Sequence, residues 1–290
     1  MAVGNSTSGS LADSLPTIIA SARIVREQEG VMPQLVEKQT LGEGIGLSWN
    51  EVSYAQLTAQ AITETTELDN PQQLSDSLIT ITPTVIGIET VITDRVAARI
   101  TKNGYAKLGA LAQNAMQRKK DDDGLTVLDG FSNSYCGAGS TLTSGHIGAA
   151  VSLIKGNATE PGHDPIRCVL HSYQIHDIED EILAGMGTYE ITEGLTARVF
   201  KSGFRGMVKG AQIFEDGNIT ENAGNDMKGG VFAQEAIVIV QGRAPRAVMV
   251  RDEALGGGAS KVYHYDEYAY GERLDTWGCE IFSDAVAPTS

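Results

Sequence analysis

The chain has 290 residues, of which 41% are hydrophobic, enough for one large domain or two modest domains with a sizeable core. Asp and Glu outnumber Lys and Arg by 37 to 22, and the resulting formal charge of −15 argues against a protein whose main task is to grip nucleic-acid phosphates. Three distant cysteines form no disulfide framework and favour a reducing compartment. The longest aliphatic run, residues 236–240, is too short to cross a membrane, and the polar N-terminus does not read as a signal peptide.

The first 40 residues predict an arm followed by a helix. Residues 1–12 are small and polar. Leu15, Ile18, Ala22 and Val25 then fall on one face of a helix, for which Gly30 is a suitable end. Little in the neighbouring sequence could cover this apolar stripe.

Residues 41–83 predict two long strands joined by a polar turn within 63–77. Their apolar residues are thinly spaced: Trp49, Tyr54, Leu57, Ile62 and Leu68. The alternative is a surface excursion without a special role, but a structureless loop of this length is uncommon in a compact domain. Because a two-stranded hairpin is marginally stable by itself in water, we expect another part of the assembly to cover it.

The returning strand changes its alternation near Pro83. Ile79 and Ile81 are odd-numbered, whereas Ile86 and Ile88 are even-numbered, and a regular strand would place these pairs on opposite faces. Proline also removes one donor from the ladder. We therefore predict a bulge or bend between Pro83 and Ile86, where the chain leaves an exposed hairpin and enters a packed sheet.

The middle of the chain predicts helices, and the last hundred residues predict strands. Apolar spacing indicates a helix that begins near Asp94, breaks or kinks at Gly104 and ends at Gly124. A second helix is predicted from Ser144 to Gly156, then a buried strand at 166–171 and a helix capped by Ser172. From Gly187 onward, strands alternate with glycine turns. The fold class is therefore α+β.

Two groups of side chains could bind a metal. Asp121, Asp122 and Asp123 carry oxygen ligands, but consecutive residues point in different directions, and a solvated helix end is the preferred interpretation. The second group combines sulfur, nitrogen and oxygen ligands: Cys168, His171, His176 and Glu179. Its spacing gives no reason for the residues on the predicted strand to lie near those on the predicted helix. Because no nucleophile, base and orienting residue are recognisable, we expect no catalytic residues, no metal and no cofactor.

The ordered set of segments resembles the major capsid proteins of tailed double-stranded-DNA bacteriophages. The resemblance begins with "LADSLPTIIASA" and continues through "ITPTVIGIETVITD", "LTSGHIGAAVSLI" and "IRCVLHSYQIHDI". It extends through "GMVKGAQIFEDGNI", "GGVFAQEAIVIV" and "AVMVRDEA" to the closing "YAYGERLDTWGCEIFSDA". No segment is a strict motif, and their order and spacing carry the resemblance over most of the chain.

This resemblance implies the phage capsid fold, with an N-terminal arm, an extended β-hairpin (E-loop), a peripheral domain with a spine helix, and an axial domain. The implied boundaries are 1–40 for the arm, 41–83 for the hairpin, 84–143 for the peripheral domain, 144–235 for the axial domain and 236–290 for strands returning to both. It also implies hexamers and pentamers that close into an icosahedral shell around phage DNA. The chain would then reside in the virion after assembly in the host cytoplasm.

For contacts between subunits we single out Trp49, Tyr54, Ile79 and Ile81, although packing within the hairpin itself is the alternative for each. Residues 48–83 contain no Lys, so the covalent cross-link of some family members is not expected. Expected partners are other copies of the chain, a portal, a scaffolding protein or an earlier proteolytic cut, and decoration proteins. The alternatives are an encapsulin-like nanocompartment shell protein and a soluble metal-dependent enzyme.

Overall fold

The computed structural model describes residues 28, 30–42, 44, 46–65, 71–98, 102–184, 206–255 and 257–287, and leaves the side chains of residues 102–108 and 183–184 undescribed. The predicted helix at residues 15–25 lies outside these ranges, as do Leu68, Ile100 and the expected strands within 187–205. No helix in the described ranges is long and apolar enough to span a membrane.

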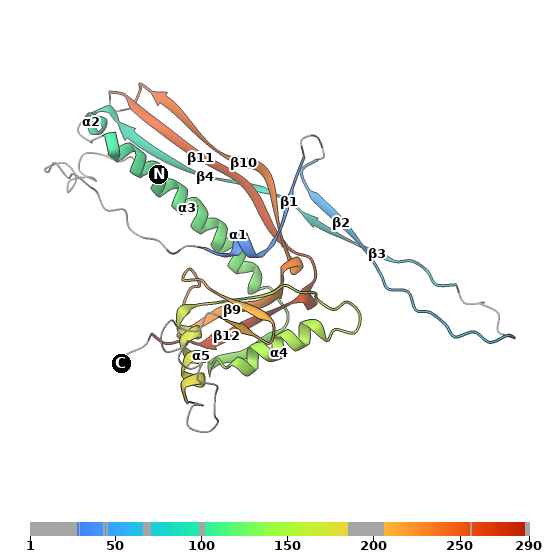
Figure 1. The fold of residues 1–290 in the computed structure, drawn as a ribbon. Helices are drawn as coiled ribbons and strands as arrows, with labels where there is room; N and C mark the ends of the chain where they lie inside the picture. Colours follow the sequence, from blue (N-terminus) through green and yellow to red (C-terminus); the bar gives the residue numbers. More distant parts are fainter. Residues whose placement is uncertain are drawn as a thin grey trace.

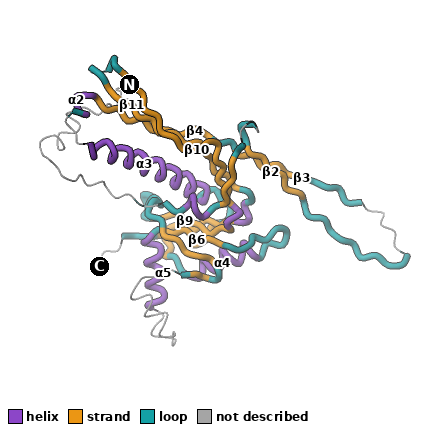
Figure 2. Tube along the Cα trace, turned by 45° about the horizontal axis from the view of Figure 1, so that its top comes forward, coloured by secondary structure: helices purple, strands orange, loops and turns teal. Residues whose placement is uncertain are grey.

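Two sheets and a projecting hairpin organise the chain (Figure 1). A four-stranded sheet has the order β1-β10-β11-β4. Its strands are β1 (Glu37–Thr40), β4 (Thr84–Thr93), β10 (Ile237–Asp252) and β11 (Ala259–Glu272). All neighbours in this sheet are antiparallel except β1 and β10. The sheet is long and narrow, because β10 and β11 continue as a ribbon well beyond the short β1 (Figure 2).

The second sheet has six strands in the order β5-β12-β9-β6-β8-β7. They are β5 (Ser134–Thr141), β6 (Ile166–Leu170), β7 (Met207–Val208), β8 (Ala211–Glu215), β9 (Asp226–Ala233) and β12 (Gly278–Asp284). Helices α4 (Ser144–Lys155) and α5 (Ser172–Ala184) lie beside this sheet (Figure 1). Two short 3₁₀ turns connect the two sheets, η3 (Gln234–Ala236) and η4 (Asp275–Trp277).

The main core lies in and around the six-stranded sheet. Ile147 and Ile154 of α4 are fully buried there with Val231, Phe232 and Ile281 of the central strands. The α4 periodicity matches its prediction, with Gly156 at the C-terminal end. Its N-cap is Thr143 instead of Ser144, because the Thr143 and His146 side chains form a capping box.

Helix α3 (Lys102–Leu128) runs beside the four-stranded sheet without a break (Figures 1 and 2). The predicted break at Gly104 and end at Gly124 are therefore wrong. A Cβ at Gly124 would lie 2.8 Å from the Met32 Cβ and 3.2 Å from the Tyr270 Cζ. Gly124 thus serves close packing of α3 against α1 (Met32–Leu35) and β11, a role that no local pattern reveals.

The predicted change of pairing near Pro83 is confirmed, but the interruption precedes the predicted stretch from Pro83 to Ile86, because β4 is already regular from Thr84. Strand β3 (Asp76–Ile81) pairs only with β2 (Trp49–Tyr54), whereas β4 pairs with β11 in the four-stranded sheet. Thr82 and Pro83 interrupt the strand between the two pairings. Beyond β4, the short helix α2 (Asp94–Ala97) turns the chain toward α3.

One strand departs from the expected grouping of residues. Residues 134–141 were expected to belong with 84–133. Instead β5 pairs in parallel with β12 in the six-stranded sheet, from Ser134 opposite Glu280 to Thr141 opposite Asp284. The paired residues are more than 140 positions apart in the sequence, so the pairing leaves no local signal in either strand.

Candidate assembly surfaces

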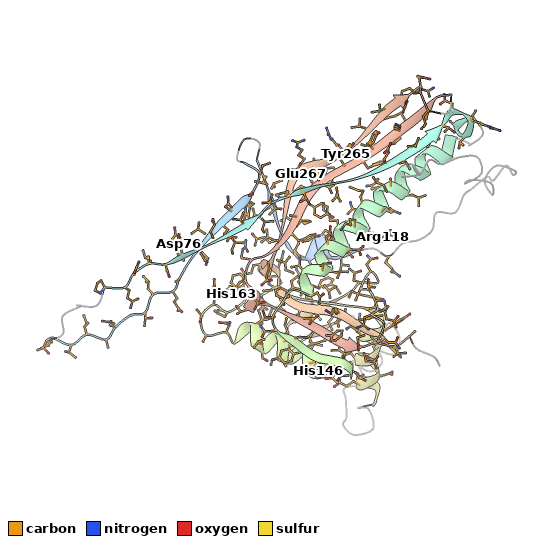
Figure 3. All side chains as sticks on the ribbon, turned by 180° about the vertical axis from the view of Figure 1, so that it is seen from behind. Asp76, Arg118, His146, His163, Tyr265 and Glu267 are labelled. Atoms are coloured by element: carbon orange, nitrogen blue, oxygen red, sulfur yellow. The ribbon has the colours of Figure 1, made fainter. Side chains whose placement is uncertain are left out.

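The β2–β3 hairpin projects from the body of the molecule, with Asp76 far out along it (Figure 3). Its strands pair antiparallel from Trp49 opposite Ile81 to Tyr54 opposite Asp76. Directly opposite residues share one face of a sheet, and alternate residues along a strand share a face. The register therefore separates the predicted residues: Trp49, Ile79 and Ile81 lie on one face, and Tyr54 lies on the other.

The face with Trp49 is anchored to the body. Ile81 is only 5% exposed and packs with Val238 and Val240 of β10, and Trp49 and Ile79 are partly buried against this group. Three of the four predicted assembly residues thus pack at the hairpin root within their own chain. The alternative stated for them was packing within the hairpin itself; here they pack against β10 of the body as well.

The opposite face of the hairpin carries a row of exposed side chains. Tyr54 is 71% exposed, Leu78 63% and Val52 46%. Val52 and Leu78 are directly opposite each other in the register. Neither residue is among those predicted from the sequence, although both share the even-numbered alternation of Tyr54. Exposed aromatic and aliphatic residues in a row are typical of an interaction surface.

Beyond the paired strands, two arms continue without regular structure over residues 55–63 and 71–75. The predicted strands are therefore shorter than expected. Exposed apolar residues are present on both arms, namely Leu57, Ile62 and Leu74. The Ala55 amide donates a 2.9 Å hydrogen bond to the Ser75 carbonyl, and the Gln72 side chain bonds both the amide and the carbonyl of Thr58 across the two arms.

An ion-pair network fixes the direction of the hairpin. Arg273 donates hydrogen bonds to Glu51 of β2 at 2.8 Å, to Glu37 of β1 at 2.6 Å and to the Glu235 carbonyl at 3.0 Å. The hydrogen bond from Arg273 lowers the pKa of Glu37. The guanidinium therefore ties the hairpin to the strand beside it and to the turn before β10.

A groove of about 630 Å³ lies between the hairpin and the body. Glu51, Ser53 and Ile79 line it on the hairpin side, and Arg273 and Trp277 line it on the body side. The Trp277 indole donates a 2.9 Å hydrogen bond to the Glu160 carbonyl, which holds this wall in place.

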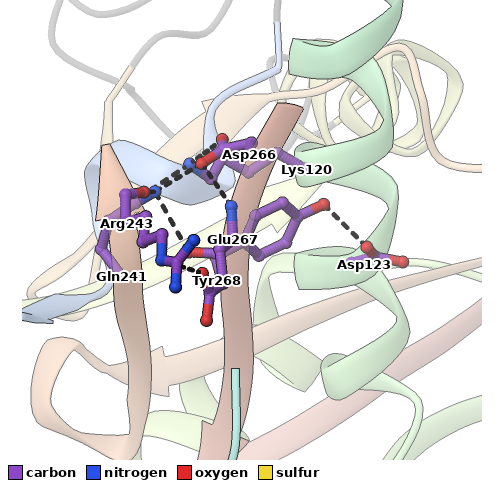
Figure 4. Close-up of polar contacts among 7 residues, drawn as sticks. All are labelled: Lys120, Asp123, Gln241, Arg243, Asp266, Glu267 and Tyr268. Atoms are coloured by element: carbon purple, nitrogen blue, oxygen red, sulfur yellow. Dashed lines mark hydrogen bonds and ion pairs between the residues drawn. The ribbon is translucent and has the colours of Figure 1, made fainter. Parts of the chain in front are cut away.

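A buried polar cluster joins α3 to the ribbon of β10 and β11 (Figure 4). The Lys120 ammonium lies 2.9 Å from the Asp266 carboxylate and 3.1 Å from the Gln241 amide oxygen. Its Nζ also lies 4.6 Å from the centre of the Tyr268 ring, and the Tyr268 hydroxyl donates a 2.8 Å hydrogen bond to Asp123. The prediction that Asp121–Asp123 form a solvated helix end is therefore wrong.

Asp121 belongs to a second buried polar group, which binds the backbone amides at the start of α1. It is fully buried and accepts hydrogen bonds from the Met32 amide at 2.9 Å and from the Asn218 side chain at 2.9 Å. The fully buried Asp216 accepts a 3.3 Å hydrogen bond from the Val31 amide, and the two carboxyl groups also hydrogen-bond each other. Burial, followed by the nearby Asp121 charge, raises the pKa of Asp216 to about 7.

The structure separates the candidate metal ligands. Cys168 is buried in the core of the six-stranded sheet, where desolvation raises the pKa of its thiol. The His171 ring instead packs edge-on against Tyr173, and His176 pairs with Asp180 one turn away on α5. In the part of the chain that the structure describes, no three His, Cys, Asp or Glu side chains are placed to hold a metal.

Comparisons with known proteins bear on the fold. No family model matches the chain, and no curated protein matches its sequence. Among solved structures, the capsid of cyanophage Pam1 superposes with a TM-score of 0.74 at 11% identity, over 99% of this chain and 100% of that chain. The capsid of cyanophage P-SCSP1u has a TM-score of 0.73 at 12% identity, over 98% and 97%. The head of Helicobacter pylori bacteriophage KHP40 has a TM-score of 0.71 at 11% identity, over 98% and 99%.

These matches span nearly the whole of each chain, so they include the hairpin as well as both sheets. The predicted fold class is confirmed: this chain has the α+β fold of phage capsid proteins.

Proposed function

We propose that this chain is a major capsid protein, which assembles as hexamers and pentamers into the icosahedral shell of a tailed bacteriophage. The observation that carries the proposal is the end-to-end likeness to phage capsid structures. The exposed hairpin supports it independently. A two-stranded ribbon with Val52, Tyr54 and Leu78 in water gains stability when a second copy covers it.

In this proposal the two sheets have separate tasks. The four-stranded sheet with α3 is the peripheral domain, and α3 is its spine helix. The six-stranded sheet with α4 and α5 is the axial domain, toward the centre of each hexamer or pentamer. The hairpin is the E-loop, which lies over a neighbouring subunit, and Arg273 sets the angle at which it leaves the body.

The role is structural, with no catalytic residue and no cofactor. Double-stranded DNA is enclosed without sequence-specific binding, in keeping with the charge of −15, because a shell that must release its DNA gains nothing from tight phosphate contacts. A portal, a scaffolding protein and decoration proteins are the further partners, the virion is the final location, and assembly takes place in the host cytoplasm.

The test is assembly of the purified chain with and without its scaffolding protein, followed by negative-stain imaging and light scattering. Closed icosahedral particles are the expected product. Because copies of charge −15 repel one another and salt screens this repulsion beyond about 8–10 Å, assembly should be faster at moderate than at very low salt. A monomer that remains compact at high concentration with scaffold present would refute the proposal.

The same preparation separates the alternatives. Shells that form efficiently without scaffold or portal and capture a cargo peptide would favour an encapsulin-like compartment. Stoichiometric zinc in the purified chain would favour an enzyme. Tight binding of duplex DNA by free subunits at physiological salt would remove the argument from charge.

A further inference from the structure

The chain enters α1 over two buried carboxyl groups that belong to different layers of the fold. Asp121 lies on α3, which runs beside the four-stranded sheet, and Asp216 directly follows β8 of the six-stranded sheet. Both residues are fully buried, and the two carboxyl groups hydrogen-bond each other. Because two charged carboxylates in contact repel each other strongly, the pair is stable with one proton between them.

Three residues before α1 lie over this pair, namely Gln28, Gly30 and Val31, here called the strap. A Cβ on Gly30 would lie 2.3 Å from the Asp121 Cγ, and a Cβ on Gly217 would lie 2.5 Å from the Gln28 Cδ. The strap is therefore in direct contact with both segments that carry the carboxyl groups. Its approach to Asp121 requires a residue without a side chain.

Polar contacts hold the strap, whereas apolar burial holds α1. The Val31 amide donates a 3.3 Å hydrogen bond to Asp216, and the Met32 amide donates a 2.9 Å hydrogen bond to Asp121. The side chains of Met32 and Leu35 are buried in the main core, and that of Val31 packs partly against it. A change at the carboxyl pair can therefore free the strap while α1 stays in place, with a hinge at Val31.

The titratable groups that face the pair come from α3 and β11. Asp121 is itself the charge that acts on Asp216. On β11, burial followed by the Asp121 charge raises the pKa of the Tyr270 hydroxyl, and the same two effects raise the pKa of Asp122 on α3. Other charged groups on the neighbouring elements act on different partners: Lys120 on Asp266, Asp123 on Tyr268, and Glu215 and Glu221 on His171.

Burial opposes ionisation of the pair more strongly than the surrounding hydrogen bonds favour it. The Asn218 amide donates a 2.9 Å hydrogen bond to Asp216, and the Asn218 side chain donates one of 2.9 Å to Asp121. These bonds and the Val31 amide stabilise a charged carboxylate. Burial and the Asp121 charge outweigh them and raise the pKa of Asp216 to about 7. Above this pH the buried pair carries two negative charges.

The strap is the part of this site that can yield. Two buried carboxylates gain free energy when water reaches them. Leu128 of α3 and Ala211 of β8 lie in the main core, which fixes the elements that carry Asp121 and Asp216. Gln28 of the strap is exposed, and two amide hydrogen bonds are its polar attachment to the pair. Withdrawal of the strap would hydrate both carboxylates without disturbing the core.

We propose that the strap is a proton-controlled latch, which stays closed while the Asp121–Asp216 pair holds a proton and opens at Val31 when the proton leaves. An open latch changes the direction in which the preceding residues leave the body. This inference goes beyond the proposed function and does not depend on it, because the latch belongs to the single subunit.

Hydrogen exchange measured by mass spectrometry tests the latch on the purified subunit. Labelling at about pH 6 and about pH 8, with times scaled for the intrinsic exchange rates, compares a peptide that contains Val31 and Met32 with a peptide from α4. Protection of the first peptide should fall roughly tenfold between the two conditions, because about one pair in ten still holds its proton one unit above the pKa. Protection of α4 should not change.

Three variants separate the latch from its surroundings. Asp216→Asn can accept the Val31 amide and donate to Asp121 without titrating, so the strap should stay protected in both conditions. Gly30→Ala should leave the strap unprotected in both, because its Cβ would overlap the Asp121 carboxyl group. In the matched control, Asp122→Asn, the pH dependence should remain, because the strap amides bind the other two carboxyl groups.

Each contrary outcome would overturn the latch. Equal protection of the strap in both conditions would show that the unmodified chain does not open. The same fall in Asp216→Asn, or no fall in Asp122→Asn, would show that another group holds the proton. A parallel fall in α4 would show that the whole subunit loosens. None of these results depends on particle formation, so the capsid function is tested separately.

Discussion

Arg273 reaches Glu51 across 222 residues of sequence, and its Nε donates a 2.8 Å hydrogen bond to the Glu51 carboxylate. The same guanidinium holds Glu37 at 2.6 Å. Only 14% of the Arg273 side chain is exposed, so solvent screens the pairs less than it screens surface pairs. The root of the hairpin is therefore held both by the apolar group around Ile81 and by one planar cation.

Replacement of Arg273 should affect assembly more than folding. In Arg273→Lys the charge remains, but one ammonium cannot reproduce the separate Nε and Nη1 contacts to the two glutamates. We expect a subunit with a native circular dichroism spectrum, a slightly lower melting temperature and a clearly lower yield of closed particles. Arg273→Gln should be more severe in both respects. Normal particle yield in Arg273→Gln would show that the apolar root alone orients the hairpin.

The two faces of the hairpin should respond differently to substitution. Leu78→Ser and Tyr54→Ala remove exposed side chains, so the free energy of unfolding should change by less than about 0.5 kcal/mol while the particle yield falls. Ile81→Ala should instead destabilise the subunit by about 2–5 kcal/mol, because it leaves a cavity between the hairpin and β10. Urea unfolding and particle counts measure the two effects. A loss of stability in Leu78→Ser would mean that this face is covered within its own chain.

Trp49→Ala is the intermediate case. Trp49 is partly buried against Ile81 at the root, yet its sequence context favoured a contact between subunits. We expect a moderate loss of stability together with reduced assembly. Normal assembly in a variant that is only less stable would show that Trp49 packs solely within its own chain.

The Lys120–Asp266 pair allows a double-mutant cycle in urea. Because both side chains are nearly inaccessible, with 10% and 6% exposed, Lys120→Met should destabilise the subunit by about 3–5 kcal/mol by leaving a buried carboxylate unpaired. Asp266→Leu should behave similarly. The double variant should recover much of the loss, and additive effects of the two single variants would contradict the proposed coupling.

The buried carboxyl pair should make stability depend on pH. The pKa of Asp216 is raised from 3.8 to about 7, so between these values the folded state holds a proton that the unfolded state releases. The free energy of unfolding should then fall as the pH rises from about 4 to about 7 and level off above this range.

Asp216→Asn keeps a donor toward Asp121 without titrating, so it should flatten the curve over this pH range. In the matched control, Asp252→Asn, the slope should be unchanged between pH 4 and 7, because the Lys261 contact lowers the pKa of Asp252 below this range. The same slope in Asp216→Asn and in the unmodified chain would show that another group binds the proton.

The sequence by itself determined the features that depend on local periodicity. The alternation of apolar residues predicts the hairpin and the change of sheet at Pro83. A short apolar run predicts the buried strand that is β6, and the spacing of apolar residues predicts α4. Each of these features follows from the local alternation or helical spacing of apolar residues, so it can be predicted without knowing which distant residues pack against it. The exposed face of the hairpin was not predicted: Val52, Tyr54 and Leu78 share even numbers, but only the pairing register and the exposures assign that face.

Only the tertiary structure decided how charges and glycines are used. Lys120 and Asp121 have the composition of a solvated helix end, but Asp266, Asp216 and Asn218 surround them from strands and loops about a hundred residues or more away. In the sequence Gly124 is typical of a helix end, but in the structure it allows Met32 to pack closely against α3. Whether a side chain is buried depends on which distant elements pack against it. The free energy of that packing comes from the whole core, so no short segment of sequence reveals it.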